Sequence, residues 1–280
     1  MPSHVMTLIG AGNAADDIAR KLGATVDWLA PNHAADILFD GDPTHAARLA
    51  PPGVDAVIQP AAGRRKSLLV ADMESTVIQN EMLDELADLI GIGGKVADVT
   101  HRAMNGEIDF ATSLRERVAL FAGQPETLLA EAAKRLRPSP GAATLVRTMR
   151  KHGARTVLVS GGFYAFSNIV RDRLGFDRDV ANDLIVANGK IAGTLREPIL
   201  DAAGKAAALK KNAADFGIPL SLTLAVGDGA NDLTMLEAAG LGIGYHAKPH
   251  VQARIGHRID HADLTALLYV QGYRATDFVV

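Results

Sequence analysis

Four short runs of consecutive apolar residues mark the second part of the chain. They lie at residues 67–71, 156–159, 222–226 and 241–243. Strands that are buried on both faces of a parallel sheet have this continuous apolar pattern, whereas half-exposed strands alternate between apolar and polar residues. The pattern therefore predicts an α/β fold with a Rossmann-like parallel-sheet core.

A different periodicity separates the first two of these runs. Apolar residues recur three and four positions apart over residues 82–90, and Gly91 follows them as a helix stop. Asp109 can cap a second helix, and Pro125 suits the first turn of a third one. We expect a helical block at about residues 80–140, inserted after the first core strand as a cap over the carboxyl edge of the sheet.

The first 65 residues follow another order. Strand-like runs lie at residues 5–9, 26–29, 37–39 and 54–58, and a helical pattern lies at residues 16–22. The order strand, helix, strand, strand, helix, strand is that of a ferredoxin-like α+β unit. Residues 63–66 form a polar, turn-prone boundary. We expect a small ferredoxin-like domain at residues 1–65 and a larger domain at residues 66–280.

Composition and charge remove several classes of function. The formal net charge is −3, which gives no electrostatic attraction to nucleic acid or to an anionic membrane. The chain has no cysteine, so disulfides and thiolate catalysis are excluded. No uncharged apolar run approaches the roughly 18–20 residues of a membrane span, and the first residues lack the basic stretch of a signal peptide. We expect a soluble cytoplasmic protein, whose oligomeric state the sequence leaves open.

Polar residues directly follow three of the predicted core strands. Asp72-Met73-Glu74-Ser75-Thr76 follows the first, Ser160-Gly161-Gly162 the second, and Gly227-Asp228-Gly229-Ala230-Asn231-Asp232 the third. A fourth feature, Lys205, comes after Gly204 at a predicted helix start. In open α/β sheets, ligands bind at the carboxyl ends of the strands. We therefore expect the four features to meet in one site.

In this order the four features resemble the motifs of the haloacid dehalogenase-like phosphatases, which are D-x-D-x-T, a strand-end Ser or Thr, a Lys, and G-D-x-x-x-D. Two stretches of the predicted cap are similar to those of the phosphoserine phosphatases of this family. They are Asn80-Glu81-Met82-Leu83-Asp84-Glu85-Leu86 and residues 104–118. The resemblance covers residues 66–280, and residues 1–65 resemble the degenerate ACT-like domain of longer bacterial forms. It implies hydrolysis of O-phospho-L-serine to L-serine and phosphate, the last step of serine biosynthesis.

The resemblance implies a chemical role for each charged residue near the phosphate. Asp72 would be the nucleophile, because a carboxylate lets hydrolysis proceed through a phospho-aspartyl intermediate in two easier transfers. A carboxylate that attacks a phosphate dianion meets strong repulsion, so the site needs cations. Lys205 would supply one, and Mg²⁺ would supply the other. Asp72, Asp228 and the backbone carbonyl of Glu74 would hold the Mg²⁺.

The phosphoryl oxygens would be bound mainly by neutral groups. The Ser160 hydroxyl and the backbone N–H of Gly161 can donate to these oxygens, because the glycine allows close approach near a helix N-terminus. Asn231 would hold the same side of the phosphate. Asp232 would orient the groups around the metal ion or the side chain of Lys205.

The cap would recognise the serine part of the substrate. Glu81 suits the ammonium group, and Arg117 suits the carboxylate through a two-pronged hydrogen-bonded pair. Met104 and Phe110 would form an apolar wall that excludes water from the reaction. The small phosphomonoester phosphoserine is thus the partner that the resemblance implies.

The chain departs from the family pattern at Glu74, where the pattern has a second Asp. That residue is the general acid and base, which protonates the leaving oxygen and then activates water. Glu keeps the carboxyl group but is one methylene longer, so either the loop is re-spaced around it or proton transfer is slower. Three functions stay open: a phosphoserine phosphatase, a phosphatase or phosphotransferase acting on another small phosphomonoester, and a serine-sensing protein with weakened catalysis.

Two further patterns have more ordinary explanations. Gly10-Ala11-Gly12-Asn13-Ala14-Ala15 follows a strand as a dinucleotide-binding fingerprint does, but too little chain precedes Arg65 for a full Rossmann domain. His257 and His261 stand four residues apart, as metal ligands on a helix can, but no third ligand pattern accompanies them. We interpret neither pattern as a site.

Overall fold

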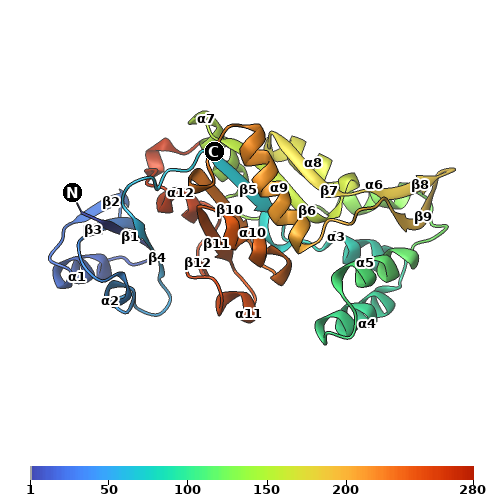
Figure 1. Cartoon of the computed structure of the whole chain (residues 1–280), viewed down its shortest axis with the longest axis horizontal. Helices are drawn as coiled ribbons and strands as arrows, with labels where there is room; N and C mark the ends of the chain where they lie inside the picture. The colour runs from blue at the N-terminus through green and yellow to red at the C-terminus, as the bar shows by residue number, and fades with distance from the viewer. Residues whose placement is uncertain (1) are drawn as a thin grey trace.

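A computed structural model describes residues 2–280 and places a six-stranded sheet at the centre of the molecule (Figure 1). Its strands are β5 (Leu68–Asp72), β6 (Arg155–Phe163), β7 (Arg178–Asn182), β10 (Thr223–Gly227), β11 (Leu241–Tyr245) and β12 (Arg258–Ile259). They lie in the order β12-β11-β10-β5-β6-β7, and every neighbouring pair is parallel. The predicted Rossmann-like core is confirmed, and its four predicted strands lie side by side.

Helices cover both faces of this sheet. One face packs against α7 (Ala142–Lys151), α8 (Tyr164–Leu174) and α12 (Ala266–Val270), and the other against α9 (Ala202–Asp215), α10 (Leu233–Ala238) and α11 (Pro249–Gln252). Leu69 and Ala71 of β5 belong to the first core, whereas Leu68 and Val70 belong to the second. Alternate side chains of a strand point to opposite faces, so a strand between two helical layers is apolar throughout.

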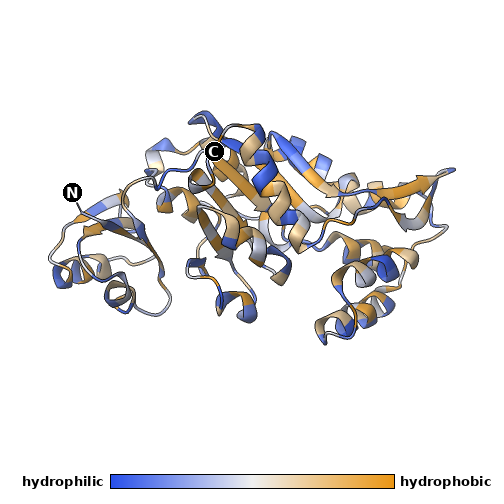
Figure 2. Cartoon of the chain, in the orientation of Figure 1, coloured by the Kyte–Doolittle hydropathy of each residue, from blue (hydrophilic) through white to orange (hydrophobic). Residues whose placement is uncertain are grey.

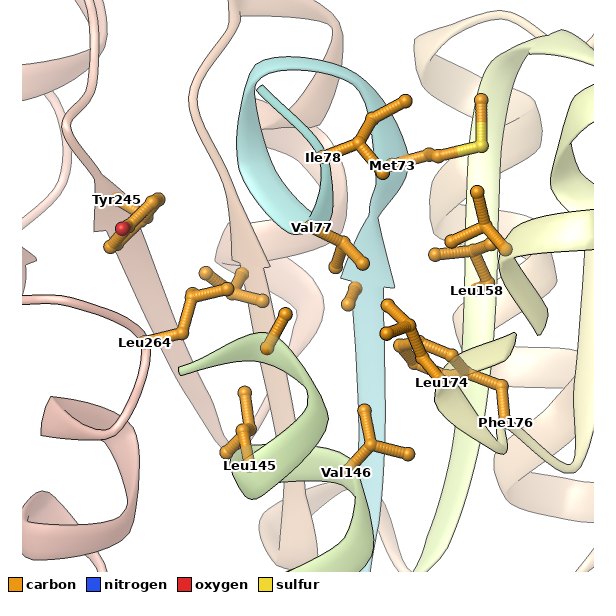
Figure 3. Close-up of a cluster of buried hydrophobic side chains, with 14 of the residues drawn as sticks. Met73, Val77, Ile78, Leu145, Val146, Leu158, Leu174, Phe176, Tyr245 and Leu264 are labelled. Atoms are coloured by element: carbon orange, nitrogen blue, oxygen red, sulfur yellow. The ribbon is translucent and has the colours of Figure 1, made fainter. Parts of the chain in front are cut away.

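The hydrophobic residues are concentrated on the central strands (Figure 2). Figure 3 shows part of the first core, where Val77 and Met73 of the turn after β5 lie near Leu158 of β6, and Leu145 and Val146 of α7 lie below them. Burying side chains of this size stabilises the fold by about 1.5–3 kcal/mol each. This packing anchors the turn that carries the first motif.

A second sheet lies at the N-terminal end of the chain (Figure 1). Its elements are β1 (His4–Ile9), α1 (Ala14–Lys21), β2 (Val26–Ala30), β3 (Ala34–Phe39), α2 (Pro43–Ala47) and β4 (Asp55–Pro60). The strands are antiparallel in the order β2-β3-β1-β4, and the ferredoxin-like order is confirmed. The glycine-rich stretch after β1 therefore connects a strand of an antiparallel sheet to α1, and it is not part of a dinucleotide-binding fold. The domain boundary near residue 65 stays a prediction.

This N-terminal sheet packs directly on the central core. Ile9, Ala34 and Val57 belong to the same buried apolar cluster as Tyr269 and Leu264 of the C-terminal part. The opposite face of the sheet is covered by α1 and α2 and forms a cluster of its own. The two parts of the chain thus share buried apolar surface.

Polar contacts secure the same junction. The Asp55 carboxylate accepts the backbone N–H groups of Asp260 at 2.7 Å and Ala262 at 2.8 Å. The Gln59 side chain donates to the Val270 carbonyl at 2.7 Å. Hydrogen bonds to a charged acceptor contribute roughly 1.5–3 kcal/mol each. The N-terminal sheet is therefore bound to the core by specific contacts as well as by apolar area.

The predicted helical block follows β5 and projects from the other end of the molecule (Figure 1). It contains α3 (Met82–Leu89), α4 (Gly93–Met104), α5 (Phe110–Ala119) and α6 (Thr127–Ala133). The Asp109 side chain caps α5 by accepting the Thr112 N–H at 2.7 Å, as predicted. The sequence reasoning missed α4, because that helix buries only Val96 and begins with two glycines. The helix predicted from Pro125 to Leu136 is α6, which begins at Thr127 and ends at Ala133.

A hairpin of β8 (Leu184–Ala187) and β9 (Lys190–Leu195) lies against this block. Backbone hydrogen bonds join Gly123 to Ile191 and Glu126 to Gly189. The hairpin therefore supports the base of the cap. Among residues 2–280, no helix is both long and apolar enough to cross a membrane.

Candidate active site

The carboxyl ends of the three central strands bring the strand-end motifs together. Asp72 is the last residue of β5 and stands opposite Val159 of β6, directly before Ser160. On the other side of β5, Ala71 stands opposite Val226 of β10, two residues before Asp228. The predicted convergence of these motifs thus follows from the strand order and register.

Lys205 joins this group from the first turn of α9. The Asp201 side chain caps that helix by accepting the Gly204 N–H at 2.8 Å, which fixes the turn. The Lys205 ammonium donates to Asp72 and, at 2.7 Å, to Asp232. Burial alone would lower the pKa of Lys205, but Asp232 and Asp72 raise it, so the ammonium stays charged.

The nucleophile candidate lies in a strongly charged environment. Asp72 is buried, and burial together with the charge of Asp232 raises the pKa of its carboxyl group well above 3.8, while Lys205 lowers it. Without further positive charge, ionised Asp72 would be costly at this position. A second cation, in addition to Lys205, would therefore stabilise the ionised carboxylate of Asp72.

Asp72, Asp228 and Asp232, named here the acidic triad, each offer one oxygen within 4.8 Å of the others. Carboxylate oxygens are the ligands that hard divalent cations prefer. Both oxygens of Asp232 already accept hydrogen bonds, from Lys205 at 2.7 Å and from the Gly229 N–H at 3.0 Å. Asp72 and Asp228 are thus the better placed ligands, which fits the prediction that Asp232 has an orienting role.

Asp228 also has a partner that the sequence reasoning missed. Burial raises the pKa of Asp228, and the ammonium of Lys248 lies 3.2 Å from its Oδ2. Lys248 directly precedes Pro249, the first residue of α11. The sequence does show a lysine between a core strand and a helix, which is a usual place for a site residue. No pattern in the sequence, however, connects this lysine to Asp228.

Two of the residues predicted to bind the phosphoryl oxygens, Ser160 and Gly161, lie in the C-terminal half of β6, and Asn231 follows β10. Ser160 is buried, and its Oγ accepts the Gly162 N–H at 2.9 Å. The Gly161 carbonyl is held by Asn182 Nδ2 at 2.8 Å. A Cβ atom on Gly161 would lie 3.2 Å from the ring of Phe110 and 4.0 Å from Asn231 Nδ2. The missing side chain therefore lets Phe110 and Asn231 approach the same backbone, so these predicted residues are neighbours.

Glu74 occupies the turn after Asp72, and its carboxyl group is held on two sides. Its Oε1 accepts the N–H of Met82 at the start of α3 at 2.8 Å. A Cβ atom on Gly162 would come within 2.8 Å of its Oε2, so the longer side chain rests against that glycine. Burial, followed by the charge of Glu81, raises the pKa of Glu74 to about 8. Glu74 can therefore hold a proton at neutral pH.

Glu81 and Arg117 lie at the mouth of the site. Glu81 directly precedes α3, and its Oε1 accepts the Ser75 hydroxyl at 2.7 Å. Its side chain is open to solvent on one side, yet the surrounding protein still raises its pKa. Arg117 on α5 is half-buried. Burial lowers the pKa of its guanidinium, whereas the charges of Asp84, Glu74 and Glu81 raise it. Within residues 2–280 it donates only to the Ser113 carbonyl, at 3.4 Å.

The structure does not bring Met104 to the site. Met104 ends α4, and its side chain is 77% exposed. Only Phe110 of the predicted apolar wall lies near Gly161. Met104 is exposed because α4 packs weakly: this helix buries one residue and lies at the far end of the cap. His257, one of the two histidines that we did not interpret as a metal site, contacts the Ile58 carbonyl at 2.9 Å.

Comparison with known proteins agrees with this geometry. The family model of the haloacid dehalogenase-like hydrolases matches residues 69–237. A phosphoserine phosphatase of Mycobacterium tuberculosis is 43% identical over 75% of this chain, and the chain spans 52% of its length. A phosphoserine phosphatase of Lactococcus lactis is 41% identical over 72% of this chain and 94% of the relative.

The solved structures include a relative that aligns with nearly the whole fold. It is a hydrolase of the same family from Salmonella enterica serovar Typhi, with a TM-score of 0.88 and 27% identity over 96% of this chain and 98% of that chain. The likeness therefore extends over the N-terminal sheet as well as the catalytic core. With the family model on the core and the Lactococcus relative matched almost from end to end, this chain belongs to the haloacid dehalogenase-like hydrolases.

Proposed function

We propose that this protein is a cytoplasmic phosphoserine phosphatase that uses Mg²⁺. The observation that carries the proposal is the pair of opposite charges at the mouth of the site. Glu81 at the start of α3 and Arg117 on α5 belong to the cap, and within residues 2–280 Arg117 forms no ion pair. Asp72, Lys205 and Ser160 of the core are buried. Serine carries an ammonium and a carboxylate next to its hydroxyl, so the pair of Glu81 and Arg117 matches the two groups that flank its phosphate. The names of the relatives support the same substrate.

The donor set fits a divalent cation. Asp72 and Asp228 offer carboxylate oxygens, and burial of both carboxylates makes a nearby positive charge favourable. We propose Mg²⁺, held by these two residues and by the Glu74 backbone carbonyl. When bound, the ion would neutralise part of the charge on Asp72, Asp228 and the phosphate.

The residues of the chain then perform two displacements at phosphorus. In the first, an oxygen of Asp72 forms a bond to phosphorus while the bond to the seryl oxygen breaks, and that oxygen takes the proton of Glu74. In the second, water attacks phosphorus and gives a proton to Glu74, and phosphate leaves as the Asp72 carboxylate is restored. The pKa of about 8 supports Glu74 as an acid that is protonated at neutral pH before the first step.

The remaining polar groups would hold the substrate in place. Ser160 and the Gly161 N–H of β6, with Asn231 of the turn after β10 close to Gly161, would donate to the phosphoryl oxygens. Lys205 would compensate the charge that Asp72 and the phosphate bring together. Asp232 would keep the ammonium of Lys205 aimed at Asp72, which the contacts of that ammonium support.

A substrate screen with and without Mg²⁺ tests the proposal. We expect Mg²⁺-dependent phosphate release that is fastest with O-phospho-L-serine and slower with O-phospho-L-threonine and with sugar phosphates. A preference for a sugar phosphate would contradict the role of Glu81 and Arg117. The absence of turnover with every ester, together with binding of serine, would indicate a sensing protein instead.

A further inference from the structure

Lys248 is an exposed cation that contacts the acidic triad. Its ammonium lies 3.2 Å from Oδ2 of Asp228. Asp228 is also the one member of the acidic triad that Lys205 does not contact, since Lys205 donates to Asp72 and Asp232. Among residues 2–280, two lysines therefore contact the triad: the buried Lys205 contacts Asp72 and Asp232, and the exposed Lys248 contacts Asp228.

The backbone of Lys248 is fixed independently of its side chain. Its N–H donates to the Asp228 carbonyl at 3.1 Å, and its carbonyl accepts the N–H groups of Val251 and Gln252 at 2.8 and 3.0 Å. The side chain itself is 57% exposed. The ammonium can thus leave the Asp228 carboxylate without disturbing the loop that carries it.

The charge of the Lys248 ammonium acts on more carboxylates than the one that it contacts. Burial lowers the pKa of Lys248, but the charges of Asp228, Glu81 and Asp232 raise it further, so the protonated form is favoured. Lys248 in turn favours the ionised form of Glu81. Lys248 therefore contacts the proposed cation ligand Asp228 and interacts electrostatically with the proposed ammonium ligand Glu81.

We propose that Lys248 is a counter-ion of Asp228 that competes with a divalent cation. Its ammonium weakens divalent-cation binding to the phosphate-free site and strengthens this binding once a phosphate dianion is present. The inference rests on the proposed Mg²⁺-dependent function. With no phosphate bound, Lys248 and the cation compete for the same carboxylate. When phosphate is bound, its two negative charges attract both Lys248 and the divalent cation. The two positive groups then no longer compete for Asp228 alone.

The expected size of the effect follows from exposure and charge. A solvent-exposed pair of unit charges changes a binding constant by only a few fold, and a divalent cation doubles the charge that Lys248 repels. Replacing the ammonium by a neutral side chain should therefore tighten the binding of Mg²⁺ alone by about three- to tenfold. The same replacement should weaken the binding of inorganic phosphate to the Mg²⁺-saturated protein by a similar factor.

Calorimetric titration of Mg²⁺ into the metal-free, full-length protein tests the first half of the inference. The variants are Lys248→Met, Lys248→Arg and the control Lys211→Met. Lys211 forms an exposed ion pair with Asp215 at 2.9 Å in the last turns of α9, away from the triad. We expect tighter Mg²⁺ binding only in Lys248→Met, with Lys248→Arg and Lys211→Met close to the wild type.

Titration of inorganic phosphate at saturating Mg²⁺ tests the second half. Phosphate should bind more weakly to Lys248→Met and nearly normally to Lys248→Arg. Unchanged or weaker Mg²⁺ binding in Lys248→Met would overturn the inference, because Lys248 would then only hold Asp228 in place. If the wild type itself bound no Mg²⁺, the proposed metal-dependent function would fall together with the inference.

Discussion

Replacing Glu74 by Asp restores the residue that the family pattern has, and we expect this change to slow the enzyme. The Glu74 carboxyl group reaches the Met82 N–H at 2.8 Å and rests against Gly162. Both contacts depend on the full length of the side chain. The site has therefore been built around glutamate, and aspartate should leave the carboxyl group out of position.

The magnitude follows from the geometry. Removing one methylene withdraws the carboxyl group by about 1.5 Å, the length of one carbon–carbon bond. The hydrogen bond from Met82 would then exceed the range of a normal hydrogen bond. A misplacement of about 1 Å costs on the order of 10² in rate, whereas complete loss of a general acid costs on the order of 10²–10⁴. We expect Glu74→Asp to lower kcat by about 10- to 100-fold and Glu74→Gln to lower it further.

Steady-state phosphate release from phosphoserine, measured from pH 6 to 9.5, is the assay. In the wild type kcat should fall above a pH of about 8, because Glu74 must carry the proton that it gives to the leaving oxygen. p-Nitrophenyl phosphate is the control substrate, because its leaving group needs little protonation. The loss in both variants should be smaller for the first step with this ester.

Two results would refute this reasoning. If Glu74→Asp were as fast as the wild type or faster, the contacts with Met82 and Gly162 would not position the acid. If Glu74→Gln kept normal turnover of phosphoserine, another group would have to carry the proton.

Four further outcomes test other parts of the account. By urea unfolding, Glu74→Gln should be as stable as the wild type at pH 4 and more stable at pH 9. Folding raises the pKa of Glu74 from 4.5 to about 8, so the wild type loses stability as the pH rises through this range; at about 1.36 kcal/mol per pH unit the gain should be on the order of 4–5 kcal/mol, and equal stability at pH 9 would contradict it. Asp72→Asn should abolish phosphate release and keep the circular dichroism spectrum, and near-normal turnover would exclude the phospho-aspartyl route. Arg117→Met should raise KM for phosphoserine by roughly 10- to 100-fold but leave p-nitrophenyl phosphate nearly unaffected, because only the first has a carboxylate; equal losses would argue against the pairing. Asp55→Ala should lower the melting temperature by several degrees, because Asp260 and Ala262 lose a charged acceptor, and an unchanged melting temperature would show that apolar packing alone holds the N-terminal sheet.

The sequence alone was sufficient for the parts of the site that are encoded next to a strand. An apolar run predicts a buried strand, and a parallel sheet puts all carboxyl ends at one edge. Asp72, Ser160 and Asp228 could therefore be expected to meet, and the strand order of the structure brings them together. Asp109 as a helix cap is equally local, because a cap bonds the backbone of its own first turn.

Only the tertiary structure decided which distant side chains touch. Lys248 reaches Asp228, and Phe110 reaches Gly161, because of how a loop and a helix are packed on the sheet edge. Met104 was expected beside Phe110 from their shared stretch of sequence, yet it faces solvent because α4 packs weakly. Local sequence determines hydrogen bonds and periodicity within an element. The distance between elements depends on the burial of many side chains at once, and no short pattern carries that information.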